Sequence, residues 1–189
     1  MPGRNTPQRW GWVAQFLHWS IALLIIGLVI VGLTMDELPN SPDKVKLYAL
    51  HKSTGLTVLV LVLLRLIWRL VDPRPPYPAT MPAWQKKVSN LSHGLLYVLM
   101  LSQPLSGWLY NSASNFPLQW FRLFKVPALS GPDPELKSLA LAIHEIGFYV
   151  LGVLFALHVA AALKHHFVDR DATLARMTPG LSARNQEIS

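Results

Sequence analysis

The chain of 189 residues contains no cysteine, and this absence removes several kinds of site at once. Disulfide bonds, iron–sulfur clusters and thiolate zinc sites all need cysteine, and so does the C-x-x-C-H motif that attaches a haem covalently. No H-E-x-x-H motif occurs either, although a catalytic zinc site on a helix commonly uses it. Any prosthetic group would therefore be held without a covalent link through sulfur.

Charged residues are also scarce, at 14% of the chain against 51% hydrophobic residues. This balance is typical of an integral membrane protein. Four apolar runs are long enough to cross a bilayer as helices. We therefore expect an all-α fold, an integral membrane four-helix bundle in a single domain over residues 1–189. Its helices are predicted at about 10–34, 43–71, 82–110 and 135–166, with a flexible C-terminal tail at about 172–189.

The net charge of +7 is distributed unevenly along the chain. The two terminal segments and the loop between the second and third helices carry eleven basic and four acidic residues, whereas the remaining loops and helix ends carry six of each. By the positive-inside rule, both termini are predicted to be cytoplasmic. Topology thus accounts for the positive charge, so we expect membrane lipid as a partner and no nucleic acid.

Histidines lie inside the predicted helices, where an unpaired polar side chain is costly. His144 and His158 are fourteen residues apart in the last helix, which is close to four full turns. They therefore share one face and lie about 21 Å apart along the axis, so that one sits near each leaflet of a core about 30 Å thick. If successive helices alternate in direction, His51 lies at the depth of His144, and His18 and His93 lie at the depth of His158.

Two imidazoles from different helices at one depth can fill both axial positions of a haem iron. Such an iron has no open position for oxygen, so the chemistry indicated is electron transfer. A hydrogen-bonded packing role is the usual explanation for a single membrane histidine, and a zinc site is a weaker functional alternative because few carboxylates lie nearby. Five histidines at matching depths favour haem over both. Spacing leaves open whether His18 or His93 faces His158.

Five segments, in the same order, resemble the bacterial cytochrome b561 family, and the resemblance covers nearly the whole chain. They are QFLHW at 15–19, LHKSTG at 50–55, SHGLLY at 92–97, PLSGW at 104–108 and LKHHFVDRD at 163–171. The resemblance implies a multi-pass protein of the bacterial inner membrane with two haems b. It also implies one haem ligand from the first helix, one from the second and two from the fourth. Carried across, these are His18 with His158 at the inner haem, and His51 with His144 at the outer haem.

Cationic residues near these histidines are candidates for further roles. Arg65 follows His51 by fourteen residues, so it shares that face one leaflet deeper and is predicted to hold a propionate of the inner haem. Lys164 and His165, at the cytoplasmic end of the last helix, are candidate catalytic residues that receive and protonate a quinone headgroup. The alternative, a basic membrane anchor formed with His166, stays equally open. Lys52 either guides an anion to the outer haem or extends its ammonium to the interface.

The resembled family is associated with quinone chemistry, and one of its branches oxidises superoxide. We therefore expect a di-haem b transmembrane oxidoreductase that passes electrons between a periplasmic donor, superoxide among the candidates, and membrane ubiquinone. The main alternative is a haem-bearing membrane anchor subunit that relays electrons for a separate periplasmic partner protein. A helical membrane scaffold without haem is the third hypothesis for its function.

Overall fold

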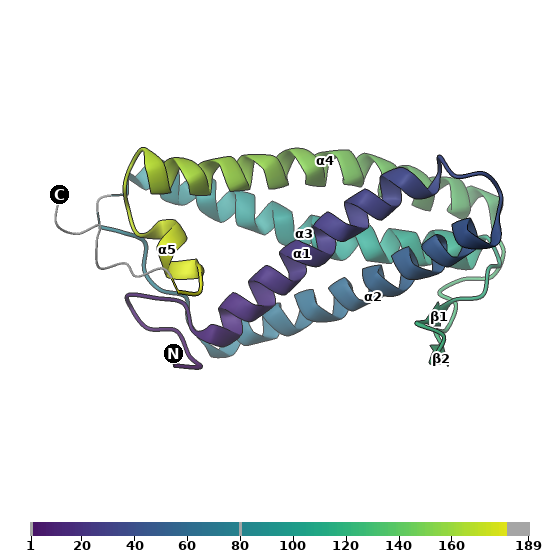
Figure 1. The fold of residues 1–189 in the computed structure, drawn as a ribbon, viewed down its shortest axis with the longest axis horizontal. Coiled ribbons are helices and arrows are strands. Elements are labelled where there is room, and N and C mark those ends of the chain that lie inside the picture. Colours follow the sequence, from purple (N-terminus) through teal and green to yellow (C-terminus); the bar gives the residue numbers. More distant parts are fainter. Residues whose placement is uncertain (1, 80, 181–189) are drawn as a thin grey trace.

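The protein is a bundle of long helices that run alternately in opposite directions (Figure 1). The structure, a computed structural model, describes residues 2–79 and 81–180. Its helices are α1 (Trp12–Met35), α2 (Pro42–Val71), α3 (Ala83–Ala113), α4 (Pro134–Phe167) and the short α5 (Thr173–Met177). The starts of α1 and α3 and the ends of α2 and α4 lie at one end of the bundle, called the terminal end here; the opposite end is called the hairpin end.

Two of the long helices begin at side-chain caps that the sequence encodes locally. Ser41 Oγ accepts from the backbone N–H of Lys44 at 3.2 Å, and Pro42 occupies the first turn of α2. Asp133 Oδ1 accepts from the N–H groups of Glu135 and Leu136, each at 3.0 Å, ahead of Pro134. A cap oxygen satisfies N–H groups that have no partner within the helix, and proline loses nothing in the first turn. These caps fix where α2 and α4 start at the hairpin end.

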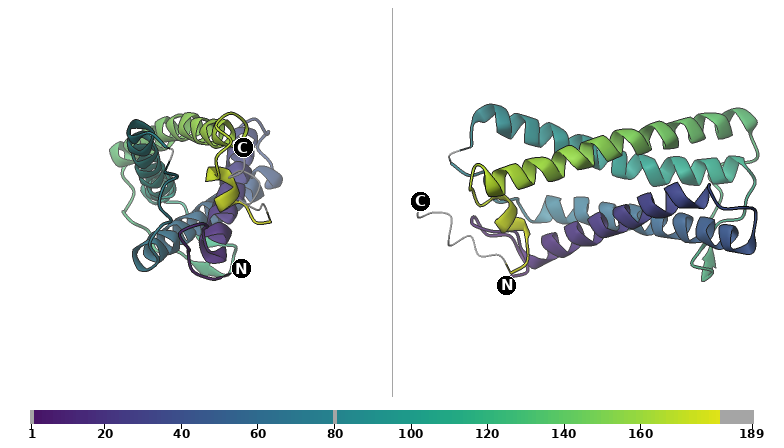
Figure 2. Two further views of the ribbon diagram at one scale, coloured as in Figure 1. Left: turned by 90° about the vertical axis from the view of Figure 1, so that its left-hand side faces the viewer. Right: turned by 45° about the horizontal axis from the view of Figure 1, so that its top comes forward.

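The long helices form two pairs, α1 with α2 and α3 with α4, and α2 also contacts α3 (Figure 2). The apolar core lies between α1 and α2, where Ile21 and Ile25 meet Val58 and Val62. Side chains of α3, including Tyr97, pack against this cluster. Burying these branched side chains together removes apolar surface from the surroundings and fixes the first pair against α3.

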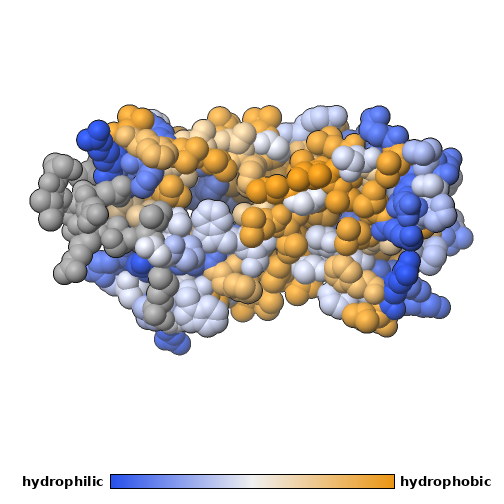
Figure 3. All heavy atoms as spheres, in the orientation of Figure 1, coloured by the Kyte–Doolittle hydropathy of each residue, from blue (hydrophilic) through white to orange (hydrophobic). Residues whose placement is uncertain are grey.

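Three helices, α1, α2 and α4, are long and apolar enough to cross a membrane. α3 is of similar length but carries more polar residues, and within the described residues it does not meet the same criterion. Apolar side chains cover the middle of the visible face of the bundle, and polar residues gather at both ends (Figure 3). A belt of this kind suits a lipid environment. The predicted fourth span stays a prediction.

The expectation of a mainly helical fold is confirmed, and a small hairpin that was not predicted lies between α3 and α4. Strands β1 (Gln119–Trp120) and β2 (Phe124–Lys125) pair antiparallel. Two residues are too few for any alternating pattern to show in the sequence, so the strands were not predicted. The described chain is mostly helical rather than entirely so.

A second difference concerns the segment predicted as a flexible tail from residue 172. Residues 172–180 include α5, which is joined to the first helix by two hydrogen bonds. Trp19 Nε1 donates to the carbonyl of Met177 at 3.0 Å, and Gln15 Nε2 donates to that of Arg176 at 3.3 Å. These bonds join residues about 160 positions apart, so a local reading of the sequence gives no sign of them. Residues 181–189 of the predicted tail lie outside the described residues.

Candidate functional site

At the hairpin end, His51 of α2 and His144 of α4 face each other with ring centres 6.3 Å apart. Each ring lies against a glycine of a neighbouring helix. A Cβ added at Gly32 would lie 3.4 Å from His51 Cε1, and one added at Gly107 would lie 3.2 Å from His144 Cε1. The two glycines therefore leave space for the rings. The contact between His51 and His144 joins the α1–α2 pair to the α3–α4 pair.

Two groups of α3, which histidine spacing does not predict, orient His144. Its Nδ1 donates to the carbonyl of Gln103 at 3.0 Å and lies 3.1 Å from Ser106 Oγ. Because a carbonyl only accepts, Nδ1 carries the proton and Nε2 keeps its lone pair. A metal-binding histidine commonly has this arrangement, in which a backbone carbonyl fixes the ring and leaves the other nitrogen for the metal. Ser106 and Gly107 belong to the PLSGW segment, whose resemblance to the family was the signal for them.

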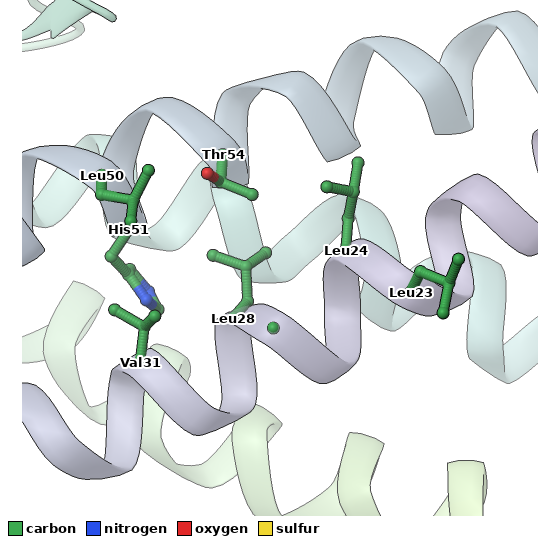
Figure 4. Close-up of a pocket in the computed structure, with 8 residues that line it drawn as sticks. Leu23, Leu24, Leu28, Val31, Leu50, His51 and Thr54 are labelled. Atoms are coloured by element: carbon green, nitrogen blue, oxygen red, sulfur yellow. The ribbon is translucent and has the colours of Figure 1, made fainter.

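His51 has a different environment. Its Nδ1 is buried and makes no hydrogen bond within the described residues. An apolar cavity of about 150 Å³ opens beside it between α1 and α2, lined by leucines of α1 with Val31, and by Leu50 and Thr54 of α2 (Figure 4). Cavities that bind cofactors are typically larger, roughly 300 Å³ or more, so this one is not by itself a cofactor pocket. It leaves one side of His51 next to open apolar space.

At the terminal end, two further imidazoles lie next to His158 of α4. The ring of His18 on α1 lies 6.2 Å away between centres, and the ring of His93 on α3 lies 5.2 Å away. His93 Nδ1 donates to the carbonyl of Ser89 in its own helix at 2.6 Å. The structure thus brings together all three histidines that spacing placed at this depth.

Arg65 of α2 reaches into the same cluster. Its Nη1 donates to His18 Nδ1 at 2.8 Å, and its guanidinium lies 5.9 Å from the centre of the Tyr97 ring. Among the residues that the structure describes, no carboxylate forms an ion pair with it. A cation at membrane depth is costly without an anionic partner. Arg65 is therefore a cation that lacks an anion beside the histidine cluster.

The end of α4 carries a charged network that holds both predicted quinone-site residues. Lys164 Nζ lies 2.8 and 2.7 Å from the two carboxylate oxygens of Asp169. His165 Nδ1 donates to Asp171 at 2.7 Å and lies 3.1 Å from Asp169. Asp169 and Asp171 follow His165 by four and six residues, and this spacing in the LKHHFVDRD segment was the available signal for the network.

The predicted site residue Lys52 lies at the hairpin end, next to His51 in the chain. Its ammonium stands 5.5 Å from the centre of the Phe116 ring, in a cation–π arrangement. Other lysines near this end are already engaged, since Lys46 pairs with Asp43 at 2.8 Å and Lys44 donates to the carbonyls of Asp36 and Leu38. Lys52 is thus the basic residue nearest in sequence to the paired rings of this end.

Comparison with known proteins decides the family. The model for prokaryotic cytochrome b561 matches residues 9–180. The chain belongs to this family. It is 34% identical over 175 residues to Cytochrome b561 homolog 2 of Escherichia coli, covering 92% of this chain and 93% of that protein. It is 29% identical over 176 residues to a protein of Yersinia pestis named probable superoxide oxidase CybB, covering 86% of this chain and 92% of that one. The family resemblance seen in the sequence is confirmed.

Membership of the cytochrome b561 family implies haem b binding and membrane electron transfer. The spacing of the rings allows a test of fit. A metal bonds an imidazole nitrogen at about 2 Å, and the ring centre lies about 1.2 Å further on, so two rings on opposite sides of one metal have centres about 6.4 Å apart. The pairs His51–His144 and His18–His158 are at 6.3 and 6.2 Å. His93–His158, at 5.2 Å, is too close for this arrangement.

Arg65 gives a second test of fit, because its missing anion matches the propionate groups of a haem. The hydrogen bond from Arg65 requires His18 Nδ1 to accept, so a neutral His18 carries its proton on Nε2. Binding iron through Nε2 would need that proton to leave or move, and an anionic acceptor for Arg65 would help by drawing the guanidinium away. The unpaired charge of Arg65 fits an anionic group such as a haem propionate, whereas the tautomer of His18 would have to change for its Nε2 to bind iron; the role of Arg65 stays a prediction.

Proposed function

We propose that this protein is a di-haem b oxidoreductase that spans the bacterial inner membrane with four helices and passes electrons from a periplasmic donor to ubiquinone. The observation that carries the proposal is the presence of two histidine pairs, one near each end of the bundle, with one member of each pair on α4. Two redox centres at different depths give a route across the membrane, whereas a single one would not.

The proposed topology places the terminal end in the cytoplasm. Eleven of the seventeen lysine and arginine residues belong to the termini, to the loop after α2 and to the adjoining helix ends. Basic residues are retained on the cytoplasmic side during insertion, which supports this orientation. The hairpin end then faces the periplasm.

In this proposal His51 and His144 hold the outer haem, and His18 and His158 hold the inner one. A haem b with two imidazole ligands supplies one-electron transfer and leaves no position for oxygen. The chain's own contribution is to fix the ligands: Gln103 and Ser106 set the tautomer of His144, and the glycines beside the rings admit them. His93 then packs beside His158 without acting as a ligand.

The substrates are assigned to opposite ends. Lys164 and His165 are proposed to meet ubiquinone at the cytoplasmic interface, where His165 can deliver a proton. Superoxide is the proposed donor at the other end, supported by the name of the Yersinia pestis relative and by the position of Lys52 beside His51. A lysine there would favour the approach of a small anion.

The test is made on the purified full-length protein. Two haems b per chain are expected by the pyridine haemochrome assay, and acid–acetone should extract all of the colour because no cysteine can form a thioether. A stoichiometry of one or none would contradict the di-haem proposal. If the purified chain alone reduces a ubiquinone analogue when given superoxide, it is an enzyme; haem without such turnover would instead favour the anchor subunit that relays electrons for a partner protein.

Replacing Arg65 with glutamine is expected to lower the midpoint potential of the inner haem. Reduction adds an electron next to Arg65, so a cation there favours the reduced form. A unit charge about 8 Å from the added electron, at an effective dielectric constant of about 20, stabilises the reduced form by about 2 kcal/mol. This energy corresponds to about 90 mV in the midpoint potential of a one-electron couple. Redox titration of the haem absorbance measures the shift.

Arg69→Gln is the matched control, because Arg69 also lies over the Tyr97 ring, at 5.5 Å, but donates no hydrogen bond to His18. Arg69→Gln is expected to shift the midpoint potential of the inner haem less than Arg65→Gln does. Arg65→Lys, which keeps the positive charge, should leave that potential close to its value in the unchanged protein. Equal potentials in Arg65→Gln and the unchanged protein would show that Arg65 does not act on the inner haem.

A further inference from the structure

The hairpin lies beside the bundle rather than beyond its end. Figure 1 shows β1 and β2 projecting sideways next to α2. Ser53 Oγ donates to the carbonyl of Gln119 at 3.2 Å and accepts from the N–H of Phe121 at 3.0 Å. Trp120 Nε1 donates to Thr57 Oγ1 at 3.0 Å. Both anchoring residues of α2 are more than ten residues from its first residue, Pro42, so the hairpin is attached about 16 Å or more along the helix axis.

This depth corresponds to the apolar part of the first helix. Gly32 of α1 is level with His51, since a Cβ there would touch the His51 ring. Ser53 and Thr57 lie further toward the middle of α2 than His51 does. The apolar run of α1 extends beyond Gly32 to Leu33 before the first polar residues. The hairpin is therefore level with side chains that face lipid.

The tip of the hairpin combines exposed apolar and basic side chains. Phe121, Leu123 and Phe124 are 43%, 73% and 57% exposed, and Arg122 and Lys125 are exposed as well. No aspartate or glutamate occurs between residues 114 and 132. Aromatic and basic residues in this combination are typical of the region where lipid headgroups meet the hydrocarbon core. Anionic headgroups complement the two cations.

The turn of the hairpin is strained in a way that keeps these side chains at its tip. Phe121 and Arg122 have φ values of 45° and 63°, and the N–H of Leu123 donates to the carbonyl of Trp120 at 2.9 Å. Positive φ at two successive residues favours Asn and Gly there, because bulky residues adopt it at a cost. Strain of this kind is commonly found where side chains have a function.

We propose that the hairpin is a membrane-interface anchor in which Phe121, Leu123 and Phe124 enter the outer leaflet while Arg122 and Lys125 bind anionic phospholipid headgroups. The proposal rests on the membrane placement proposed above for the bundle. Anchoring holds β1 against Ser53 and Thr57, two and six residues after His51. The hairpin thereby fixes the lipid level at the outer histidine pair.

The absence of native cysteine makes a direct test possible. Leu123→Cys carries a nitroxide label in the full-length protein, placed in nanodiscs of phosphatidylcholine and phosphatidylglycerol. Electron paramagnetic resonance then compares relaxation by oxygen, which concentrates in lipid, with relaxation by a water-soluble nickel chelate. Leu63→Cys, on an exposed side chain in the middle of α2, is the lipid reference, and Asn40→Cys, in the loop before α2, is the aqueous reference.

The Leu123 label is expected to resemble the Leu63 label, with high oxygen and low nickel accessibility. If the Leu63 label is itself open to the nickel chelate, the membrane placement fails, and with it the proposed function. If the Leu63 label lies in lipid while the Leu123 label is as open as that at Asn40, the anchor proposal alone is overturned, and the tip is free to contact a protein.

A matched variant changes the tip without weakening the turn. Phe121→Asn with Arg122→Gly supplies the residues that the turn conformation favours, so the hairpin should persist. In the Leu123→Cys background this variant is expected to raise nickel accessibility toward the value at Asn40. Arg122→Gln with Lys125→Gln should remove any dependence of the label's depth on phosphatidylglycerol. An unchanged depth in the first variant, or an unchanged lipid dependence in the second, would overturn the roles given to those side chains.

Discussion

His51→Ala is expected to halve the haem content of the protein and leave the spectrum of the inner haem unchanged. The ring of His51 faces that of His144 at 6.3 Å, and removing either leaves a single imidazole in that layer. His144→Ala should therefore give the same spectrum as His51→Ala. His18→Ala and His158→Ala should both remove the other haem. Reduced-minus-oxidised spectra at low temperature, with haem quantified per chain, measure the four results.

His93→Ala is the matched control, because the His93 ring lies in the inner layer with its centre 5.2 Å from the centre of the His158 ring. It is expected to keep both haems. Added imidazole should restore the missing haem in the alanine variants of the ligands, which separates loss of a ligand from failure to fold. Loss of a haem in His93→Ala together with full haem content in His18→Ala would make His93 the partner of His158.

The sequence predicted how deep each histidine lies in the bundle better than it predicted which neighbouring helix the ring faces. Fourteen residues between His144 and His158 place two rings on one face of a helix, because helical periodicity depends only on spacing. Whether His18 or His93 faces His158 depends on how α1 and α3 are rotated about their own axes, which packing determines. Spacing alone left that choice open; both rings lie close to His158, with centres 6.2 and 5.2 Å away, and His18 as the ligand stays a proposal.

Features that depend on contacts between residues far apart in the chain could not be predicted from the sequence for the same reason. The bond from His144 to the carbonyl of Gln103 uses a backbone group, so no residue type marks it. The strands have two residues each and α5 has five, too few for a recognisable repeating pattern, and both the hairpin and α5 are held by partners elsewhere in the chain. By contrast, the predicted starts at residues 43 and 135 lie within one residue of the observed starts of α2 and α4, because proline in the first turn is a local signal.

The second large effect is expected at the terminal end, where the charged network lies next to the proposed quinone site. His165 donates its Nδ1 proton toward two carboxylates, which accept only, so Nε2 is the nitrogen left to face a substrate. Lys164 pairs with Asp169 while half of its side chain stays exposed. An exposed pair contributes at most about 1 kcal/mol, so the oxygen of a bound quinone can compete for the ammonium.

Lys164→Gln combined with His165→Gln is therefore expected to slow reoxidation of the haems by a soluble ubiquinone analogue about tenfold, the effect of losing about 1.4 kcal/mol of transition-state stabilisation. Haem content and reduction from the periplasmic side should not change, since neither residue touches the histidine pairs. Stopped-flow absorbance at equal haem content makes the measurement, with His166→Gln as the control from the same basic segment. An unaltered rate in the double variant would mean that Lys164 and His165 only anchor α4 at the membrane surface. The quinone site would then lie elsewhere, and Lys52 beside the outer histidine pair is the next candidate.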